Sequence, residues 1–222
     1  MYNSYADLPD IYAETLPTGR TYVTPDGSFP SITTILGKTS NNAWLQAWKD
    51  RVGEDEAARV SKVATDRGTL VHEYLERFWN KEDIMPDLTK ENLDVIKMVN
   101  SLVKVTQKNI TLVRAQEVAV WSKTLGCAGR CDKFCDWINI PACLDYKTAK
   151  KIKTDVRDYK LQIAFYLEAH NELFPHLKMN KGIILIAVDG KDNAQEIEFD
   201  HRPFVPELKY RINTYYKNFH ER

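Results

Sequence analysis

The sequence predicts an α/β protein with a mixed central β-sheet flanked by helices, a helical N-terminal section and an N-terminal hairpin arm. Three observations support this prediction. Apolar residues recur at helical spacing in the first half of the chain, β-prone segments begin at Ile110, and a continuous apolar run follows residue 181. Such a continuous run is typical of a strand buried on both faces, so helices are expected on both sides of the sheet.

The first half of the chain predicts an arm followed by three helices. The segment "RTYVTPDGSFPSITTIL" has a Pro-Asp-Gly turn between β-prone stretches, which is typical of a hairpin. Apolar stripes predict helices over residues 43–64, 67–80 and 89–109, and Gly53 is expected to break or bend the first of them. The arm and the helical section together span residues 1–108.

The second half predicts a sheet with two further helices. Strands are expected over residues 111–122, 126–139 and 142–148, followed by an amphipathic helix over 156–174. Strands over 182–190 and 193–200 come next, and a helix over 205–219 with Pro206 in its first turn closes the chain. Because no repeat or linker interrupts this order, we expect one domain over residues 1–222 with its α/β core at 109–222.

The composition excludes a strongly basic chain. The 31 basic and 31 acidic residues give a net charge of zero, so any nucleic-acid surface must come from local clustering of charge. No apolar run reaches the length of a membrane span, and the N-terminus lacks an apolar signal region. These features favour the cytosol, with no membrane partner.

Four cysteines, Cys127, Cys131, Cys135 and Cys143, lie within seventeen residues. One interpretation is a zinc or iron–sulfur site, but the spacing lacks the paired C-x2-C of zinc ribbons. The other interpretation is buried reduced thiols, because the first three share strand parity and are expected to face one side. We favour the thiols and predict no cluster.

Two acids and a lysine lie on the two strands that are expected to form a hairpin. On a regular strand, Cys131 and Lys133 point away from the face of Asp132, whereas Asp145 and Lys147 share one face. Pairing of the strands brings Asp132 to the Asp145–Lys147 pair. Two close carboxylates repel each other unless a cation lies between them, and oxygen ligands favour Mg²⁺ or Mn²⁺.

A lysine beside such an ion stabilises charge on a phosphate or helps to orient and deprotonate an attacking water. The set therefore suits metal-dependent hydrolysis of phosphodiesters. The alternative is an ion pair on an exposed sheet face, because acid-x-lysine is common on such strands.

These residues resemble the active-site core of the PD-(D/E)XK nuclease superfamily, in which an acid is followed by an acid-x-lysine motif. Here "GRCD" is followed thirteen positions later by "DYK". "RGTLVHEYLE" resembles the G-x-x-x-H helix of the RecB-like exonuclease branch, and "LQIAFYLEA" resembles its Q-x-x-x-Y helix. "FPSITTIL" is similar to a segment of phage exonucleases and of the mitochondrial genome maintenance exonuclease. The resemblance spans roughly residues 29–170 and implies a restriction-endonuclease-like core.

The resemblance also implies roles for individual residues. Lys147 is the catalytic lysine, and Gln162 and Tyr166 shape the site and contact the DNA backbone. Glu117 occupies the place of an acid that supports the site or a second metal in some relatives. The implied metal ligands are His72, Asp132, Asp145 and the backbone carbonyl of Tyr146. For His72 the alternative is a core histidine, because Leu75 and Phe78 lie near its stripe.

A basic segment follows the lysine motif. It contains Lys150, Lys151, Lys153, Arg157 and Lys160. We interpret it as a set of phosphate contacts on the path of DNA into the site, independent of base sequence. The alternative is a solvated loop, which most charge runs are.

The leading hypothesis is an Mg²⁺- or Mn²⁺-dependent DNA exonuclease that acts on single-stranded or free DNA ends in replication, recombination or genome processing. Other replication or recombination proteins are expected partners, and a phage-encoded chain would work in the bacterial host cytoplasm. The alternatives are an endonuclease of the same superfamily and a non-catalytic domain that binds nucleic acid or a partner. The iron–sulfur cluster of some branch members needs a cysteine upstream of the histidine motif, a pattern that this sequence does not have.

Overall fold

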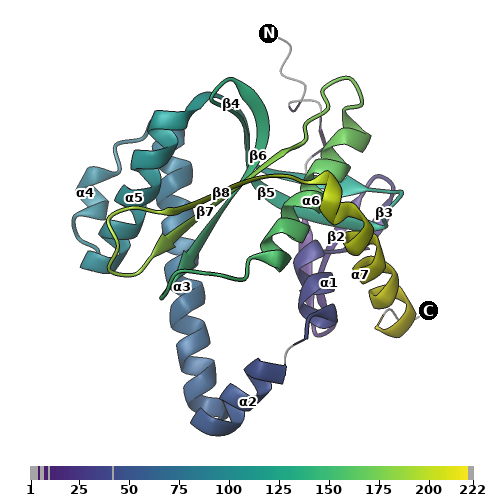
Figure 1. Ribbon diagram of the computed structural model, residues 1–222, viewed down its shortest axis with the longest axis horizontal. Coiled ribbons are helices and arrows are strands. Elements are labelled where there is room, and N and C mark those ends of the chain that lie inside the picture. The colour runs from purple at the N-terminus through teal and green to yellow at the C-terminus, as the bar shows by residue number, and fades with distance from the viewer. Residues whose placement is uncertain (1–4, 6–7, 10, 42, 220–222) are drawn as a thin grey trace.

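The computed structural model describes residues 5, 8–9, 11–41 and 43–219 and contains two β-sheets. Figure 1 shows helices on both faces of the larger sheet. The small sheet has the order β1-β2-β3, with β1 Ala13–Leu16, β2 Gly19–Thr24 and β3 Gly27–Pro30. The large sheet has the order β4-β5-β6-β7-β8, with β4 Ile110–Ser122, β5 Cys127–Trp137, β6 Ile140–Ala149, β7 Lys181–Val188 and β8 Gln195–Asp200. The helices are α1 Ile32–Thr39, α2 Ala43–Val52, α3 Glu54–Trp79, α4 Met85–Leu88, α5 Leu93–Asn109, α6 Arg157–Leu173 and α7 Val205–Asn218.

The large sheet is mixed, as the sequence predicts. Strands β6 and β7 are parallel, and α6 forms the crossover between them, whereas the other neighbouring pairs are antiparallel. A parallel pair needs such a crossover because a short turn cannot reverse the chain twice. None of the helices in the described part of the chain has the length and hydropathy of a membrane span.

Helices cover the two faces of the large sheet and form two cores. One core joins the sheet to α1, α6 and α7, and the other joins it to α3 and α5. Along β7, Ile184 and Ile186 belong to the first core, while Ile183 and Leu185 belong to the second. This arrangement explains the continuous apolar run and confirms the predicted fold class.

Two predicted boundaries in the first half are wrong. The "SITTIL" part of the expected hairpin is helix α1, because the side chain of Ser31 accepts a hydrogen bond from the Thr34 amide and caps the helix. Residues 54–79 form one helix rather than the ends of two, with three acids in its first turn. Gly53 does separate α2 from α3, at a φ of 87° that favours glycine.

The predicted alternation of side chains along β5 is wrong at its centre. Asp132 and Lys133 both contact α3, through His72 and the Trp79 ring respectively. Beyond Lys133, the side chains of β5 therefore lie on the face opposite to the one that strict alternation predicts. Cys135 lies in the core on the α3 side, whereas Cys127 and Cys131 lie in the core on the α6 side, so the three thiols do not share a face.

Lowering the pH from 6.5 to 4 is expected to reduce the free energy of unfolding, because His170 is buried as a neutral imidazole. Its exposed fraction is 0%, and the centre of its ring lies 4.7 Å from the centre of the Phe134 ring. Burial lowers the pKa of His170 from 6.5 to about 4. The unfolded chain binds this proton first, so stability is present above pH 6.5 and falls through this window. The loss attributable to this side chain is about 3 kcal/mol.

Urea denaturation at a series of pH values measures this loss. The His170→Gln variant keeps a polar side chain that does not titrate, so its stability should depend less steeply on pH between 6.5 and 4. An identical slope in both proteins would contradict the assignment.

Candidate active site

Strand β6 carries an ion pair at the centre of the candidate site. Asp145 and Lys147 lie two residues apart on the same face of the strand, as predicted, and their side chains are paired. The side chain of Asp145 is 1% exposed and that of Lys147 is 20% exposed. Burial raises the pKa of Asp145 to about 6, although Lys147 lowers it. Burial also lowers the pKa of Lys147, but the two aspartates outweigh this effect and keep the pKa above its ordinary value.

Helix α6 packs on the face of the sheet to which this pair points. The Gln162 amide donates to Asp145 Oδ1 at 3.2 Å and to the Tyr166 hydroxyl at 2.8 Å. The Lys147 ammonium also lies 5.3 Å from the centre of the Tyr159 ring. The two polar residues predicted on this helix therefore form a chain that fixes the carboxylate of Asp145.

A glycine in β5 makes room for this helix. A Cβ atom on Gly129 would lie 2.8 Å from the Tyr166 ring, closer than real side chains approach. By contrast, a Cβ atom on Gly68, the glycine of the G-x-x-x-H segment, would make an ordinary contact of 3.7 Å with Thr148. The lack of room for a side chain therefore explains the glycine at Gly129, but not the one at Gly68.

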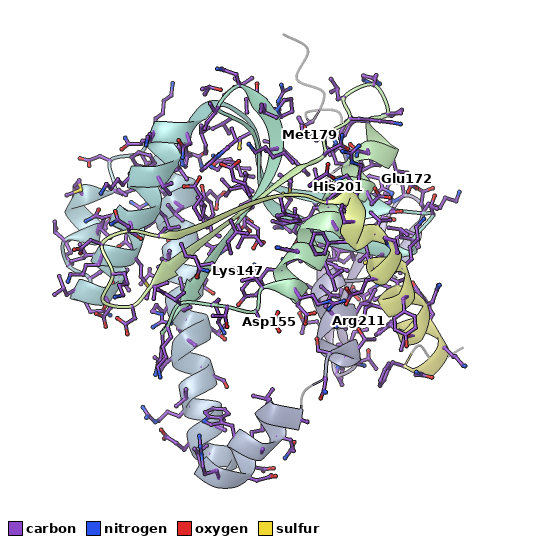
Figure 2. The ribbon with its side chains drawn as sticks, in the orientation of Figure 1. Lys147, Asp155, Glu172, Met179, His201 and Arg211 are labelled. Atoms are coloured by element: carbon purple, nitrogen blue, oxygen red, sulfur yellow. The ribbon has the colours of Figure 1, made fainter. Side chains whose placement is uncertain are left out.

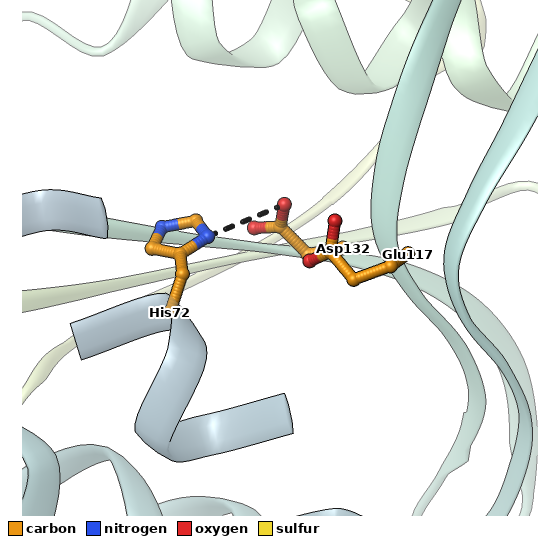
Figure 3. A group of neighbouring side chains, drawn as sticks. All are labelled: His72, Glu117 and Asp132. Carbon is orange, nitrogen blue, oxygen red and sulfur yellow. Dashed lines mark ion pairs between the residues drawn. The ribbon is translucent and has the colours of Figure 1, made fainter. Parts of the chain in front are cut away.

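Strand β5 brings Asp132 to His72 of α3. Asp132 Oδ1 lies 3.6 Å from His72 Nδ1, and Figure 3 shows this ion pair. Asp132 Oδ2 accepts from the Tyr146 amide at 2.7 Å, while His72 Nε2 lies 3.0 Å from the Tyr146 carbonyl oxygen. Burial lowers the pKa of His72, but Asp132 outweighs it and raises the pKa to about 9. His72 therefore lies in the site, where the neighbouring Asp132 favours its protonated form.

Glu117 joins the group from a distorted position in β4. Its φ of 47° is in the left-handed region, which is strained for a residue with a side chain. The flanking pairs Gln116–Lys133 and Val118–Cys131 place Glu117 opposite Asp132. Burial and then Asp132 raise the pKa of Glu117 to about 7.

The donor set fits a divalent cation. One atom each of His72, Glu117 and Asp132 lie within 4.8 Å of one another, and Figure 3 shows the three side chains converging. Two carboxylates that face each other across neighbouring strands repel, and a cation between them removes the repulsion. Asp145 lies outside this group among the described residues, although Asp132 is close enough to raise its pKa. The structure thus supports a metal site and gives Glu117 a more central place than predicted.

A cavity of about 550 Å³ opens beside these ligands. Arg20 of the arm lies across it from the acids of α3 and β4. The residues lining the cavity are Arg20, Gly68, Thr69, His72, Glu73, Glu76 and Glu117. The sequence does not mark Arg20 as a site residue, because a lone arginine in a short strand such as β2 belongs to no motif.

The basic residues after the lysine motif differ in their surroundings. Lys150, Lys151 and Lys153 are exposed on the segment that links β6 to α6. Arg157 instead pairs with Glu207 of α7, and the Lys160 ammonium lies 5.1 Å from the centre of the Phe204 ring. Figure 2 labels Lys147 of β6 and Asp155 of the segment that follows it. Contact of the five residues with DNA stays a prediction.

The face of β5 that the sequence predicts for Lys133 is wrong. The side chain of Lys133 is almost fully buried, and burial lowers its pKa to about 8. Strict alternation placed it on the face opposite Asp132. The sequence gives one signal for a role of Lys133, its place directly after the motif acid Asp132. Neighbouring opposite charges are also common on exposed strands, so this signal is weak.

Comparisons with known proteins agree with the motifs. No protein-family model matches the chain. Mitochondrial genome maintenance exonuclease 1 of Homo sapiens is 27% identical over 169 residues, which cover 71% of this chain and 48% of that protein. The chain thus spans about half the length of this relative.

Two solved structures are also similar. The protein SSO0001 has a TM-score of 0.42 and 16% identity, with 85% of this chain and 76% of that chain covered. A protein of Eubacterium rectale, provisionally assigned as an exonuclease, has a TM-score of 0.46 and 15% identity, with 70% and 69% covered. Membership of the RecB-like branch stays a prediction. The chain is therefore similar in sequence to a genome maintenance exonuclease, as its motifs predict, and this similarity is consistent with a nuclease of the PD-(D/E)XK type.

Proposed function

We propose that the protein is a divalent-metal-dependent deoxyribonuclease that acts as an exonuclease. One observation carries the proposal: Asp132, Asp145, Lys147 and His72 come from three separate elements and converge at one place. The similarity to an exonuclease supports the same activity. Residues 1–222 would act as one nuclease domain, with residues 109–222 as its catalytic core.

The proposed ligands are His72, Glu117, Asp132, Asp145 and the carbonyl oxygen of Tyr146. A bound Mg²⁺ or Mn²⁺ would supply an acidified water and neutralise charge on the phosphate. Lys147 would stabilise the negative charge that develops on the phosphate oxygens, because Asp145 and the Tyr159 ring hold its ammonium in the site. Gln162 would keep the Asp145 carboxylate in place.

The exposed lysines of the 150–156 segment would contact DNA phosphates beside the site. Such contacts do not depend on base sequence and weaken with salt. Arg157 and Lys160 would contribute less, because both already have partners within the protein. A free DNA end, a single-stranded end in particular, is the proposed substrate, and processes that maintain or copy DNA are the proposed setting. Replication or recombination proteins are proposed partners, and a bacterial host cytoplasm is the proposed compartment if the chain is phage-encoded.

Addition of Mn²⁺ to the purified protein is expected to start degradation of end-labelled linear DNA, and EDTA is expected to stop it. The physical reason is that the facing carboxylates of Glu117 and Asp132 repel a phosphate, and a divalent cation bound between them would attract it. Gel analysis of linear and circular substrates in parallel provides the measurement.

The circular substrate separates the alternatives. Degradation of linear DNA alone supports an exonuclease, whereas cutting of circular DNA supports the endonuclease. If both substrates stay intact with Mg²⁺ and with Mn²⁺, the non-catalytic binding domain becomes the better description. The retained Lys147 argues against that last outcome.

A further inference from the structure

Lys133 has a buried ammonium group whose position the proposed reaction does not explain. Its exposed fraction is 1%, and no carboxylate of the described residues forms an ion pair with it. Its ammonium donates a hydrogen bond to Gln116 Oε1, a neutral acceptor. It also lies 4.9 Å from the centre of the Trp79 ring and 5.9 Å from that of the Tyr146 ring. Three elements of the site therefore meet at this group.

The hydrogen bond to Gln116 reaches the strained part of β4. Gln116 directly precedes Glu117, whose φ of 47° turns its carboxylate toward His72 and Asp132. The Gln116 amide in turn donates to Asn80 Oδ1 at 2.9 Å, and Asn80 caps the C-terminus of α3. A chain of hydrogen bonds thus links β5, β4 and α3, and it fixes the residue directly before Glu117. A strained backbone persists only where the surroundings fix it.

The ring contact reaches the other ligands. Tyr146 gives its amide to Asp132 and its carbonyl oxygen to His72. Its ring lies on the side of the sheet where Lys133 and Trp79 pack. A shift of this ring would move the backbone group that orients both ligands.

We propose that Lys133 is a positioning residue that fixes Glu117 and Tyr146 around the cation site. The inference rests on the proposed function, because it assumes that these groups bind a metal. Lys133 touches neither the substrate nor the reacting atoms. Its role is to hold ligand groups that come from β4 and β6, and groups that orient metal ligands typically change metal affinity 10- to 100-fold when removed.

A purely structural role predicts something different. Burying an ammonium group without a carboxylate partner costs free energy, and apolar replacements of buried charges are often neutral or stabilising. Lys133→Met keeps most of the apolar stem, so the folded state should persist. A purely electrostatic role predicts the opposite change in affinity, because a nearby ammonium repels a cation and its removal would tighten binding.

The test is a calorimetric titration of the Lys133→Met protein with Mn²⁺ alone, with no DNA present. We expect the Kd for Mn²⁺ to rise about tenfold or more, with a melting temperature equal to or above that of the unchanged protein. In DNA cleavage at saturating substrate, kcat should fall, and the KM for DNA should stay the same because phosphate contacts are unaffected. Gln116→Leu breaks the same chain at its middle residue and should also weaken Mn²⁺ binding.

Lys181→Met is the matched control. Lys181 lies in the same sheet on β7, but it pairs with Glu198, which is not a proposed ligand, so the Mn²⁺ affinity of this variant should not change. Unchanged or tighter Mn²⁺ binding in Lys133→Met and Gln116→Leu would overturn the inference while the nuclease proposal stands on cleavage. An unchanged protein that neither binds Mn²⁺ nor cuts DNA would overturn both.

Discussion

Replacing Lys147 with methionine is expected to lower kcat for DNA cleavage by about a thousandfold. Asp145 pairs with the ammonium of Lys147 and holds it at the site. Methionine has a side chain of similar length but carries no charge. Developing charge on the phosphate then loses a fixed positive partner in a site of low exposure. A single-turnover cleavage assay at saturating Mn²⁺ measures the chemical step directly.

The control for this change must separate chemistry from folding. Asp145 would lose its ion-pair partner while its side chain is 1% exposed, so the variant should also lose about 3 kcal/mol of stability. The assay therefore belongs well below the melting temperature, with circular dichroism to verify the fold. Lys191→Met removes an exposed lysine between β7 and β8 that has no proposed contact with DNA, and it should leave kcat nearly unchanged. Equal kcat values for Lys147→Met and the unchanged protein would end the catalytic assignment.

The sequence predicts the parts of this site that depend on strand period and motif order. Asp145 and Lys147 share a face because the side chains of a strand alternate, and nothing in β6 interrupts the alternation. Gln162 and Tyr166 meet because residues four apart in a helix are neighbours. These relations are local, so a single sequence contains them.

The sequence does not predict relations that depend on local distortion. Glu117 turns toward Asp132 through a left-handed backbone, and Lys133 lies on the same side as Asp132. Neither feature follows from residue type, since a glutamate rather than a glycine occupies the left-handed position. The full length of α3 is also not predicted, because its mostly exposed first half has little apolar pattern and is supported by ion pairs along the helix, Glu56–Arg59 and Lys62–Asp66.

Both distortions change which side chains lie near Asp132. This explains why the residues that cluster as candidate metal ligands differ from the predicted ligands. The resemblance predicts His72, Asp132 and Asp145 as ligands, whereas the tightest cluster in the structure contains His72, Asp132 and Glu117. Asp145 is paired with Lys147 and bonded to Gln162, so its carboxylate already has partners. We therefore expect the charge balance around Asp132 to control metal binding.

Asp132→Asn is expected to weaken Mn²⁺ binding at least about 100-fold and to change the titration of His72 in the metal-free protein. Asparagine still accepts the hydrogen bond from the Tyr146 amide, so the backbone arrangement should persist. The negative charge that faces His72 is lost. Calorimetry with Mn²⁺ measures the affinity, and NMR of the imidazole protons measures the titration.

The sign of the change in His72 follows from the two opposing causes. Burial lowers the pKa of His72, and Asp132 overcomes this effect and raises it to about 9. Without Asp132, burial dominates, so the pKa should fall to 6.5 or below and His72 should be largely neutral at pH 7. Glu73→Gln, which removes an acid that lines the cavity without belonging to the cluster, should leave the pKa of His72 above 6.5. A pKa near 9 in Asp132→Asn would show that another group holds the proton on His72, and the cation cluster would then need a different central acid.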